Sequence, residues 1–369
     1  MNLSVGIIGL PGVGKTALFN ALTHRASSGG GRSTSATVPV PDERLQVLAD
    51  MVHPKRIVPT GVQFVDVAGL VKGASQEGGL GGQFLSQLQS VTALAIVLRC
   101  FPLPDIGFGP EPAHPLADLE SILLELQLSD LARVEKRSER TAKAARSRDA
   151  QAQREEQILN RLRAVLDAGH NARTAELSEA DALAVKDLGL LTLKPMIFVA
   201  NVAESDLPAA TNPDLPDEGG VRPLLAEIEE AARANDAEVA VVSAQLEAEL
   251  AELDEAEAAE YLSSLGLSAT GLSRFIAAAY RELGLLTFLT AGEPEVRAWT
   301  VRRGARAPEA AGAIHSDIER GFIRAEVTPY DKLVEAGSPQ KAKERGYTRL
   351  EGKDYVMHEG DVVYFRFNV

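Results

Sequence analysis

Residues 9–16, which read GLPGVGKT, restrict the fold of this 369-residue chain more than any other stretch. They follow an apolar run, Leu3–Ile8, and precede an amphipathic stretch, Thr16–Thr23. The spacing G-x-x-x-x-G-K-[ST] between a strand and a helix is the pattern of a phosphate-holding loop, because successive backbone N–H groups and the helix N-terminus can point at phosphate oxygens. The sequence therefore predicts a strand, a loop that cradles the phosphates of a nucleoside triphosphate, and a helix.

Individual residues of this loop predict particular contacts. Gly12 and Gly14 let the backbone curl around the phosphates. Lys15 is expected to reach the β- and γ-phosphates and so to assist catalysis, and the Thr16 hydroxyl is expected to bind Mg²⁺. The residues expected to contact the phosphates are Gly9, Gly12, Val13, Gly14, Lys15, Thr16 and Ala17.

A second apolar run, Val62–Val67, ends at Asp66 and is followed by Gly69 and Leu70. In this class of enzymes an Asp at a strand end holds Mg²⁺, and a Gly three residues later can meet the γ-phosphate through its backbone N–H. Ras-like enzymes place a Gln next, which orients the attacking water. Since Leu70 cannot polarise water, hydrolysis must use another group or be slow.

Residues 201–204, which read NVAE, end the apolar run Pro195–Ala200, where the base should lie. Guanine-specific proteins of this class use Asn-Lys-x-Asp here, and the Asp carboxylate accepts from both N1–H and N2–H₂ of guanine. Adenine has an acceptor at N1, so that carboxylate discriminates against it. Val202 replaces the Lys and the longer Glu204 replaces the Asp, which argues for ATP or for poor discrimination. The expected base-side residues are Asn201, Val202, Glu204, Ser243 and Ala244.

Short β-branched runs separated by helical stretches predict an α/β fold with a parallel sheet whose strands are buried on both faces. These runs are Leu3–Ile8, Val62–Val67, Ala93–Leu98, Pro195–Ala200 and Glu238–Val242. Between the third and fourth lies an insert whose core, Leu116–Ala168, has apolar residues at helical spacing. We interpret it as a projecting helical hairpin that turns near Arg146–Ala152.

A second module is expected after a boundary near Arg281–Leu285, where glycines and prolines punctuate short strands. The clearest of these strands are Arg297–Val301, Phe322–Val327 and Asp361–Phe367. In this module we expect Trp299 and His315 to pack rather than to catalyse.

Composition limits the compartment and the partners. No stretch approaches the roughly 18 apolar residues of a membrane span, the start lacks the features of a signal peptide, and the single cysteine, Cys100, suits a reducing cytosol. The net charge of −14 is uneven: residues 203–260 hold 17 acidic and 2 basic residues, and residues 133–163 hold 10 basic and 5 acidic residues. The basic block has three interpretations: a solvated surface, a backbone-directed and salt-sensitive RNA contact, or an arm for a protein partner.

These motifs together resemble the YchF subfamily of Obg-related P-loop NTPases. The resemblance rests on residues 9–16, 65–74, 79–81, 83–85, 98–101, 201–204 and 311–323. It implies a nucleotide-hydrolase domain over residues 1–283, interrupted by a helical hairpin at 116–190 and followed by a β-grasp TGS domain at 284–369. It also implies ATP with Mg²⁺ as ligands, a cytoplasmic location and association with ribosomes or ribosomal RNA. We expect a monomer without membrane contact.

The chain departs from the family pattern at three places. The first switch is shortened, and Thr37 is the best match for the Thr that would cover Mg²⁺ and the γ-phosphate; we expect this loop to be disordered without nucleotide. Gly107 stands where the family has a His with a catalytic role, and His114 is the nearby alternative. Gly82 replaces an Asn. The candidate catalytic positions are Lys15, Thr37 and Leu70, and the candidate metal ligands are Thr16, Asp66 and Thr37.

Three functions stay open on the sequence. The first is a slow ATPase whose ATP- and ADP-bound shapes control docking on the ribosome. The second is a GTP-binding switch, which a comparison of ATP with GTP binding separates from the first. The third is a nucleotide-stabilised RNA- or ribosome-binding protein with little turnover, which a turnover assay with and without ribosomes tests.

Overall fold

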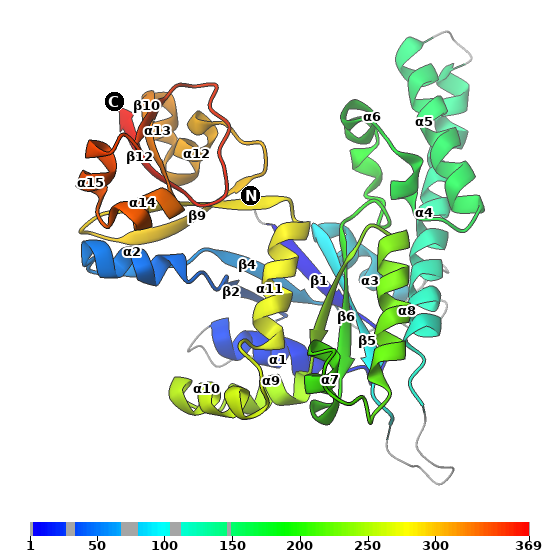
Figure 1. Cartoon of the computed structure of the whole chain (residues 1–369). Helices are drawn as coiled ribbons and strands as arrows, with labels where there is room; N and C mark the ends of the chain where they lie inside the picture. Colours follow the sequence, from blue (N-terminus) through cyan, green and yellow to red (C-terminus); the bar gives the residue numbers. More distant parts are fainter. Residues whose placement is uncertain (1–2, 27–33, 68–79, 104–111, 146–148, 369) are drawn as a thin grey trace. The chain divides into compact units, whose positions relative to one another are not determined.

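The computed structural model describes residues 3–26, 34–67, 80–103, 112–145 and 149–368 (Figure 1). The chain divides into two compact units. The first comprises Met1–Thr37 and Gln63–Ala279, and the second comprises Val38–Val62 and Tyr280–Val369. Each unit is built around its own six-stranded sheet. No described helix is long and apolar enough to cross a membrane.

The sheet of the first unit has the strand order β2-β4-β1-β5-β6-β7. Its strands are β1 (Ser4–Ile8), β2 (Ser35–Pro39), β4 (Gly61–Asp66), β5 (Ala93–Cys100), β6 (Met196–Val202) and β7 (Glu238–Val242). The five neighbouring strands β4, β1, β5, β6 and β7 pair in parallel. Every residue of β1, β5 and β6 is buried. All five predicted apolar runs form strands of this parallel sheet. The edge strand β2 was not predicted.

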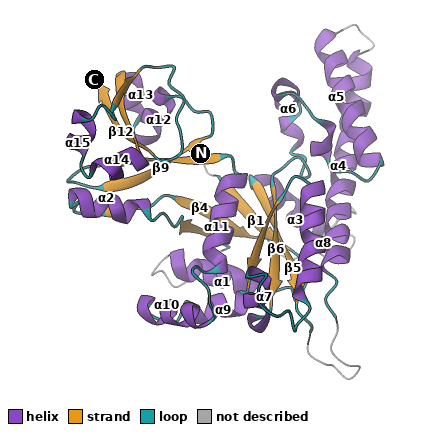
Figure 2. Cartoon of the chain, in the orientation of Figure 1, coloured by secondary structure: helices purple, strands orange, loops and turns teal. Residues whose placement is uncertain are grey.

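Helices cover both faces of this sheet (Figure 2). Those of the sheet region are α1 (Lys15–Ala26), α3 (Leu80–Ser90), α7 (Leu207–Thr211), α8 (Val221–Ala234), α9 (Ala244–Leu250), α10 (Glu255–Ser264) and α11 (Gly271–Glu282). Apolar residues of α3 and α8 share one core with β5 and β6. On β4, Phe64 contacts Phe275 of α11, with ring centroids 5.3 Å apart.

The predicted hairpin is formed by α4 (Pro115–Ala145) and α5 (Ala150–Asp167). Of the predicted turn, Arg146–Ala152, residues 146–148 lie outside the described residues. Asp149 caps α5 by accepting from the N–H groups of Gln151 and Ala152. The 31 residues of α4 span about 46 Å at 1.5 Å per residue. In Figure 1, α4 starts beside the carboxyl ends of the strands and runs back past the sheet, so its C-terminal end lies at the opposite end of the sheet.

Several arginines of the basic block are paired with acidic residues. Arg137 contacts Glu155 at 2.5 Å and Asp187 at 3.0 Å. Arg154 and Arg161 both contact Asp181, at 2.8 and 3.6 Å. Asp181 and Asp187 lie outside the block that was counted on the sequence. The surplus of positive charge on this part of the hairpin is therefore smaller than the count suggests.

The return from the hairpin to the sheet passes through η1 (Ala172–Ala175), α6 (Glu179–Ala184) and η2 (Lys186–Leu188). It is then fixed by two charged residues. Asp130 of α4 is fully buried and accepts from the backbone N–H groups of Leu191 and Thr192, each at 2.7 Å. Lys194 donates to the carbonyls of Leu88 and Gln89 at the end of α3, at 2.8 and 2.9 Å. Burial lowers the pKa of Lys194 to about 8.

The sheet of the second unit has the order β11-β10-β12-β8-β9-β3. Its strands are β3 (Ile57–Val58), β8 (Leu285–Ala291), β9 (Val296–Arg302), β10 (Phe322–Pro329), β11 (Arg349–Glu351) and β12 (Asp361–Phe367). The three strands predicted for this module are all present. Strand β3 pairs in parallel with β9, with Ile57 opposite Val296. Ile57 and Val58, which we placed in the nucleotide domain on the sequence, thus form the edge strand of the second sheet.

Each face of this second sheet has its own apolar core. On one face α12 (Ala307–Ile314) and α13 (Ser316–Arg320) cover Phe288 and Phe365. On the other face lie α2 (Arg44–Val52), α14 (Tyr330–Ala336) and α15 (Pro339–Glu344). Leu45 and Leu48 of α2 belong to the same cluster as Leu289 and Val296 of the sheet. A helix encoded before residue 60 therefore closes the core of a C-terminal module.

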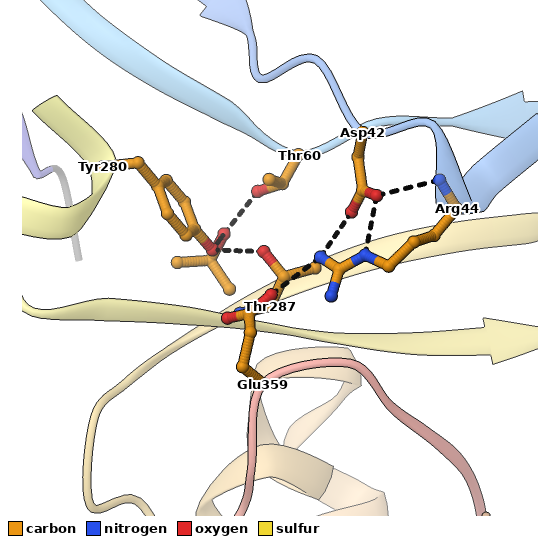
Figure 3. Close-up of polar contacts among 7 residues, drawn as sticks. Asp42, Arg44, Thr60, Tyr280, Thr287 and Glu359 are labelled. Carbon is orange, nitrogen blue, oxygen red and sulfur yellow. Dashed lines mark hydrogen bonds and ion pairs between the residues drawn. The ribbon is translucent and has the colours of Figure 1, made fainter. Parts of the chain in front are cut away.

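Polar contacts hold the same segment (Figure 3). Arg44 donates to Asp42 and to Glu359, with distances of 2.7 Å, and Glu359 accepts from the backbone N–H of Thr287 at 2.8 Å. The Tyr280 hydroxyl links the hydroxyls of Thr287 and Thr300 at 2.9 and 3.0 Å, and Thr300 also contacts Thr60. Residues 42–60 are thus joined to β8 and β9 by hydrogen bonds as well as by apolar packing.

The two residues expected to pack in this module differ. Trp299 lies against the core beside Phe288, its Nε1 donates to Thr290 at 2.9 Å, and the Arg297 guanidinium lies 4.0 Å from its ring centroid. The packing expectation for His315 is wrong. Its side chain is 62% exposed, and its Nδ1 accepts from the Asp317 N–H at 3.1 Å, so it caps α13.

Candidate nucleotide-binding site

The phosphate loop leads from the end of β1 into α1. Gly12 and Gly14 have φ values of 79° and 94°, and a Cβ on Gly14 would lie 2.3 Å from the Asn201 Nδ2. Glycine is therefore required at Gly14 both by conformation and by space. The first described bond of the helix runs from Leu18 N to Gly14 O at 3.0 Å. The N–H groups at the start of α1 have no partner within the helix and form an anion-binding terminus.

Lys15 and Asp66 lie close enough to influence each other electrostatically. The Lys15 Nζ donates to the carbonyls of Gly9 and Leu10, at 2.8 and 2.6 Å. Burial lowers the pKa of Lys15, and the Asp66 carboxylate opposes that shift. Burial likewise raises the pKa of Asp66, and Lys15 opposes it. Both charges are therefore under-solvated, as expected of a site that receives phosphates and a cation.

The residues at this end of the sheet fit Mg²⁺ bound together with a nucleotide. Thr16 is exposed at the first turn of α1, and Asp66 ends β4. Within the described ranges no group of three or more His, Cys, Asp or Glu could hold a metal. Mg²⁺ needs no such group, because it keeps several waters and binds one or two protein oxygens together with substrate phosphates. Thr16 and Asp66 would hold it, and its chemistry would be to neutralise charge on the phosphate oxygens.

The structure does not bring Thr37 to Asp66. Residues 35–39 form β2 rather than a loop, and Thr37 is exposed on it. Hydrogen bonds from Asp66 N to Thr34 O (2.9 Å) and from Val40 N to Thr60 O (2.8 Å) make β2 antiparallel to β4. In that register Thr37 is three residues from Asp66, or about 10 Å at 3.3 Å per residue. Thr34 is the threonine beside Asp66, and its polar, glycine-rich surroundings gave no sequence signal for it.

Three residues named on the sequence, Gly69, Leu70 and Gly107, lie outside the described residues. His114 is exposed immediately before α4, and Gly82 lies in α3. One residue here was missed: Arg99, which is 7% exposed and donates to the carbonyls of Phe101 and Pro112 at 3.1 and 3.2 Å. It ties together the two ends of the segment after β5. An arginine directly after the apolar run Ala93–Leu98 was the available signal.

Asn201 organises the base side of the site. It is 3% exposed, its Nδ2 donates to Val13 O at 2.9 Å, and its Oδ1 accepts from Ala244 N at 2.9 Å. One side chain thus links the phosphate loop, the end of β6 and the start of α9. Ser243, the residue before α9, is fully buried, and its Oγ has no hydrogen-bond partner within the described part of the chain.

The two remaining base-side residues, Val202 and Glu204, lie in different surroundings. Val202 is 2% exposed and belongs to the apolar core, so its side chain does not line the base as we expected. Every residue of β6 is buried, and the strand continues through Val202. Glu204 follows in η3 (Glu204–Asp206) and is partly exposed. Its Oε1 accepts from the Tyr261 hydroxyl of α10 at 2.6 Å. Tyr261 was missed because it lies 57 residues further along the chain.

Comparisons with known proteins cover both units. A family model described as a 50S ribosome-binding GTPase matches residues 4–134. A model for the C-terminal part of YchF GTPases, described as a protein of unknown function (DUF933), matches residues 285–368. The "Ribosome-binding ATPase YchF" of Bacillus subtilis (strain 168) is 45% identical over 375 residues, with 100% of each chain covered. The chain belongs to the YchF family.

Other YchF proteins extend this agreement. The "Ribosome-binding ATPase YchF" of Escherichia coli O157:H7 is 41% identical, again with 100% of each chain covered. The structure of the Schizosaccharomyces pombe YchF GTPase matches with a TM-score of 0.85 and 30% identity, and the match covers 99% of this chain and 98% of that one. The predicted α/β fold with a parallel sheet and a C-terminal sheet module is confirmed. The phosphate loop lies within the residues that the GTPase family model matches.

Proposed function

We propose that this YchF-family protein is a Mg²⁺-dependent cytoplasmic ATPase that prefers ATP to GTP, hydrolyses it slowly and uses its nucleotide state to regulate ribosome binding. The observation that carries the adenine preference is the base-side motif. Asn201 keeps both of its bracing hydrogen bonds. Val202 and Glu204 replace the Lys and Asp of guanine readers, and Val202 is buried in the core.

The adenine preference follows from hydrogen-bond complementarity. A guanine reader presents a free carboxylate to two adjacent donors on the base, and a site lacking that geometry leaves buried donors of guanine unpaired. Glu204 is one methylene longer than Asp and already accepts a hydrogen bond from Tyr261. Guanine therefore loses its strongest recognition contact, whereas adenine, with one donor at N6, loses less.

Slow turnover follows from the side chains available to orient water. Leu70 stands in place of the Gln that Ras-like enzymes use, and Gly107 stands in place of the family His. Lys15, Thr16 and Mg²⁺ stabilise charge on the phosphates, but positioning of the nucleophile is a separate contribution to the rate. ATP hydrolysis to ADP and phosphate would then depend on a group supplied by another part of the chain or by a partner.

Ribosome binding is proposed from the relatives' names and from the projecting hairpin. The bacterial relatives are named ribosome-binding ATPases, and one matching family model is described as a 50S ribosome-binding GTPase. On α4 the basic residues Lys136 and Arg140 are exposed. An arm with exposed cations and few aromatic residues suits contacts to an RNA backbone, which are salt-sensitive.

A turnover assay tests the enzymatic part of the proposal. Phosphate release from ATP is measured for the wild type and for Lys15→Ala, each with and without purified ribosomes. We expect slow release by the wild type, faster release with ribosomes, and none above background by the variant. Absence of ribosome-stimulated release, with binding intact, would favour the alternative of a nucleotide-stabilised binding protein, which the Leu70 position also supports.

Co-sedimentation with ribosomes tests the partner. The wild type is compared with the charge reversal Lys136→Glu/Arg140→Glu at about 50 and 200 mM salt, in ATP and in ADP. We expect the reversal to weaken co-sedimentation more at the lower salt, and the two nucleotides to differ. Equal binding in ATP and ADP would contradict a nucleotide switch. Unchanged binding of the reversal would move the contact to another surface.

A further inference from the structure

Glu204 and Tyr261 form a pair at the base end of the nucleotide site. The Tyr261 hydroxyl donates to the Glu204 Oε1 at 2.6 Å, which is a short hydrogen bond to a carboxyl oxygen. This bond raises the pKa of Tyr261, and the nearby Glu204 and Glu249 charges raise it further. Tyr261 is therefore a lasting donor at neutral pH, and one carboxylate oxygen of Glu204 is engaged before any nucleotide arrives.

The position of the Tyr261 hydroxyl is set by the way α10 is anchored. At its start Asp254 accepts from the N–H groups of Ala256 and Glu257, both at 2.9 Å, and Glu257 reaches back to the Asp254 N–H at 3.2 Å. This reciprocal capping fixes the first turn. The helix also packs Ala258, Leu262 and Leu265 against the apolar core. Because Leu262 is held inward, its neighbour Tyr261 is held beside Glu204.

We propose that Tyr261 is a positioning residue for base selection: by holding the Glu204 carboxylate, it prevents that carboxylate from accepting the two adjacent donors of guanine. Guanine recognition of the usual kind needs both carboxylate oxygens directed at N1–H and N2–H₂. To offer them, Glu204 would have to release Tyr261 and turn toward the base. ATP binding does not require Glu204 to release Tyr261, so the hydrogen bond between Tyr261 and Glu204 lowers the affinity for GTP selectively. This inference rests on the proposed preference for ATP.

Binding of both nucleotides to the Tyr261→Phe variant tests the proposal. Phenylalanine keeps the ring and removes only the hydroxyl. We expect GTP affinity to rise by about threefold to tenfold, the range of the net contribution of one ordinary hydrogen bond, and ATP affinity to change by less than about twofold. The matched control is Tyr364→Phe, a tyrosine that is 68% exposed in the second unit, which should alter neither affinity.

A double-mutant cycle separates positioning from a general effect of the ring. With Glu204→Gln as the second change, the carboxylate is absent and adding Tyr261→Phe should no longer alter the GTP-to-ATP ratio. NMR titration of ring-labelled tyrosines gives a readout without nucleotide: Glu204→Gln should lower the pKa of the Tyr261 hydroxyl.

The possible outcomes are distinct. A wild type that binds GTP as tightly as ATP would overturn the proposed ATP preference. A wild type that prefers ATP, combined with an unchanged ratio in Tyr261→Phe, would overturn the positioning role alone. The same applies if the two substitutions act additively, or if the Tyr261 titration is unaffected by Glu204→Gln. A selective gain in GTP affinity that disappears in the Glu204→Gln background supports the role.

Discussion

The two sheets of this protein are assembled in different ways. In the first, each parallel strand is a local apolar run, and β1, β5 and β6 are buried along their whole length. The functional residues lie at strand ends: Asp66 ends β4, and Asn201 lies near the end of β6. In the second, strand β3 and helix α2 come from residues 44–58, whereas the other strands begin at Leu285. The parallel strands of the first sheet can be predicted from the local sequence pattern. The second sheet is completed by a segment that lies more than 200 residues away in the sequence.

This difference teaches where function and stability are encoded. A phosphate loop requires a strand, a turn and a helix that are contiguous in sequence, so its chemistry is recognisable from a short motif. A sheet edge can be completed by any segment with free backbone groups and a suitable apolar face. Residues 44–58 are such a segment, and they lie in the chain between the phosphate loop and Asp66.

Leu48→Ala should cause the largest change, and that change should be confined to the stability of the second unit. Leu48 is fully buried in the cluster that α2 shares with β8 and β9, so its truncation leaves a cavity in the second unit and lowers the free energy of unfolding by about 2–5 kcal/mol. Hydrogen exchange should accelerate in β8 and β9 and remain slow in β5 and β6. The control is Val47→Ala on the same helix, where the side chain is 38% exposed. Faster exchange confined to the first unit would show that α2 does not stabilise the second sheet.

Lys15→Ala tests the complementary expectation, that nucleotide binding depends on the phosphate loop of the first unit. If the Lys15 ammonium group reaches the phosphates as we propose, its removal should weaken nucleotide binding by about 100-fold, or ~3 kcal/mol. Hydrogen exchange in the second unit should be unchanged. Lys353→Ala, an exposed lysine of that unit, is the matched control for calorimetric titration with ATP. Nucleotide affinity within about threefold of the wild type would rule out the phosphate role assigned to Lys15.

Glu359→Ala probes the polar attachment of residues 38–62. The substitution removes the acceptor for Thr287 N–H and for Arg44, and we expect the second unit to lose about 1–2 kcal/mol of unfolding free energy. The comparison variant is Asp354→Ala, which breaks the ion pair between Arg306 and the Asp354 carboxylate. Because the Asp354 side chain is 94% exposed, this substitution should have almost no effect on the unfolding free energy. Denaturant unfolding of both variants measures this. Equal losses would mean that the Glu359 contact is no stronger than a surface pair.

The last effect is a pH dependence in the first unit. Burial lowers the pKa of Lys194 from 10.5 to about 8, opposed by Asp130 and assisted by Arg133. Between these two values the unfolded chain binds more protons than the folded one, so stability rises with pH in that window. The difference in unfolding free energy between the wild type and Lys194→Met should therefore increase from pH 8 to pH 10.5. A difference that stays constant across this range would show that the pKa of Lys194 is not lowered.

The phosphate loop and the parallel strands could be predicted because both depend on residues close together in the sequence. Three features could not. The pairing of β3 with β9 depends on a long-range register that apolar periodicity does not encode. Val202 turns into the core because β6 continues through it, two residues beyond the run we had expected to end at Ala200. The contact of Tyr261 with Glu204 arises from the placement of α10, whose exposed tyrosine has no distinguishing local pattern.

Titration of the full chain with ATP and with GTP, each in excess Mg²⁺ and in the same buffer, tests the central claim most directly. The base-side motif keeps Asn201 but changes the Lys and Asp positions, and its Glu204 accepts a hydrogen bond from Tyr261. We therefore expect a lower Kd for ATP than for GTP. A Kd for GTP equal to or below that for ATP would contradict the claim and identify the protein as a guanine-nucleotide switch.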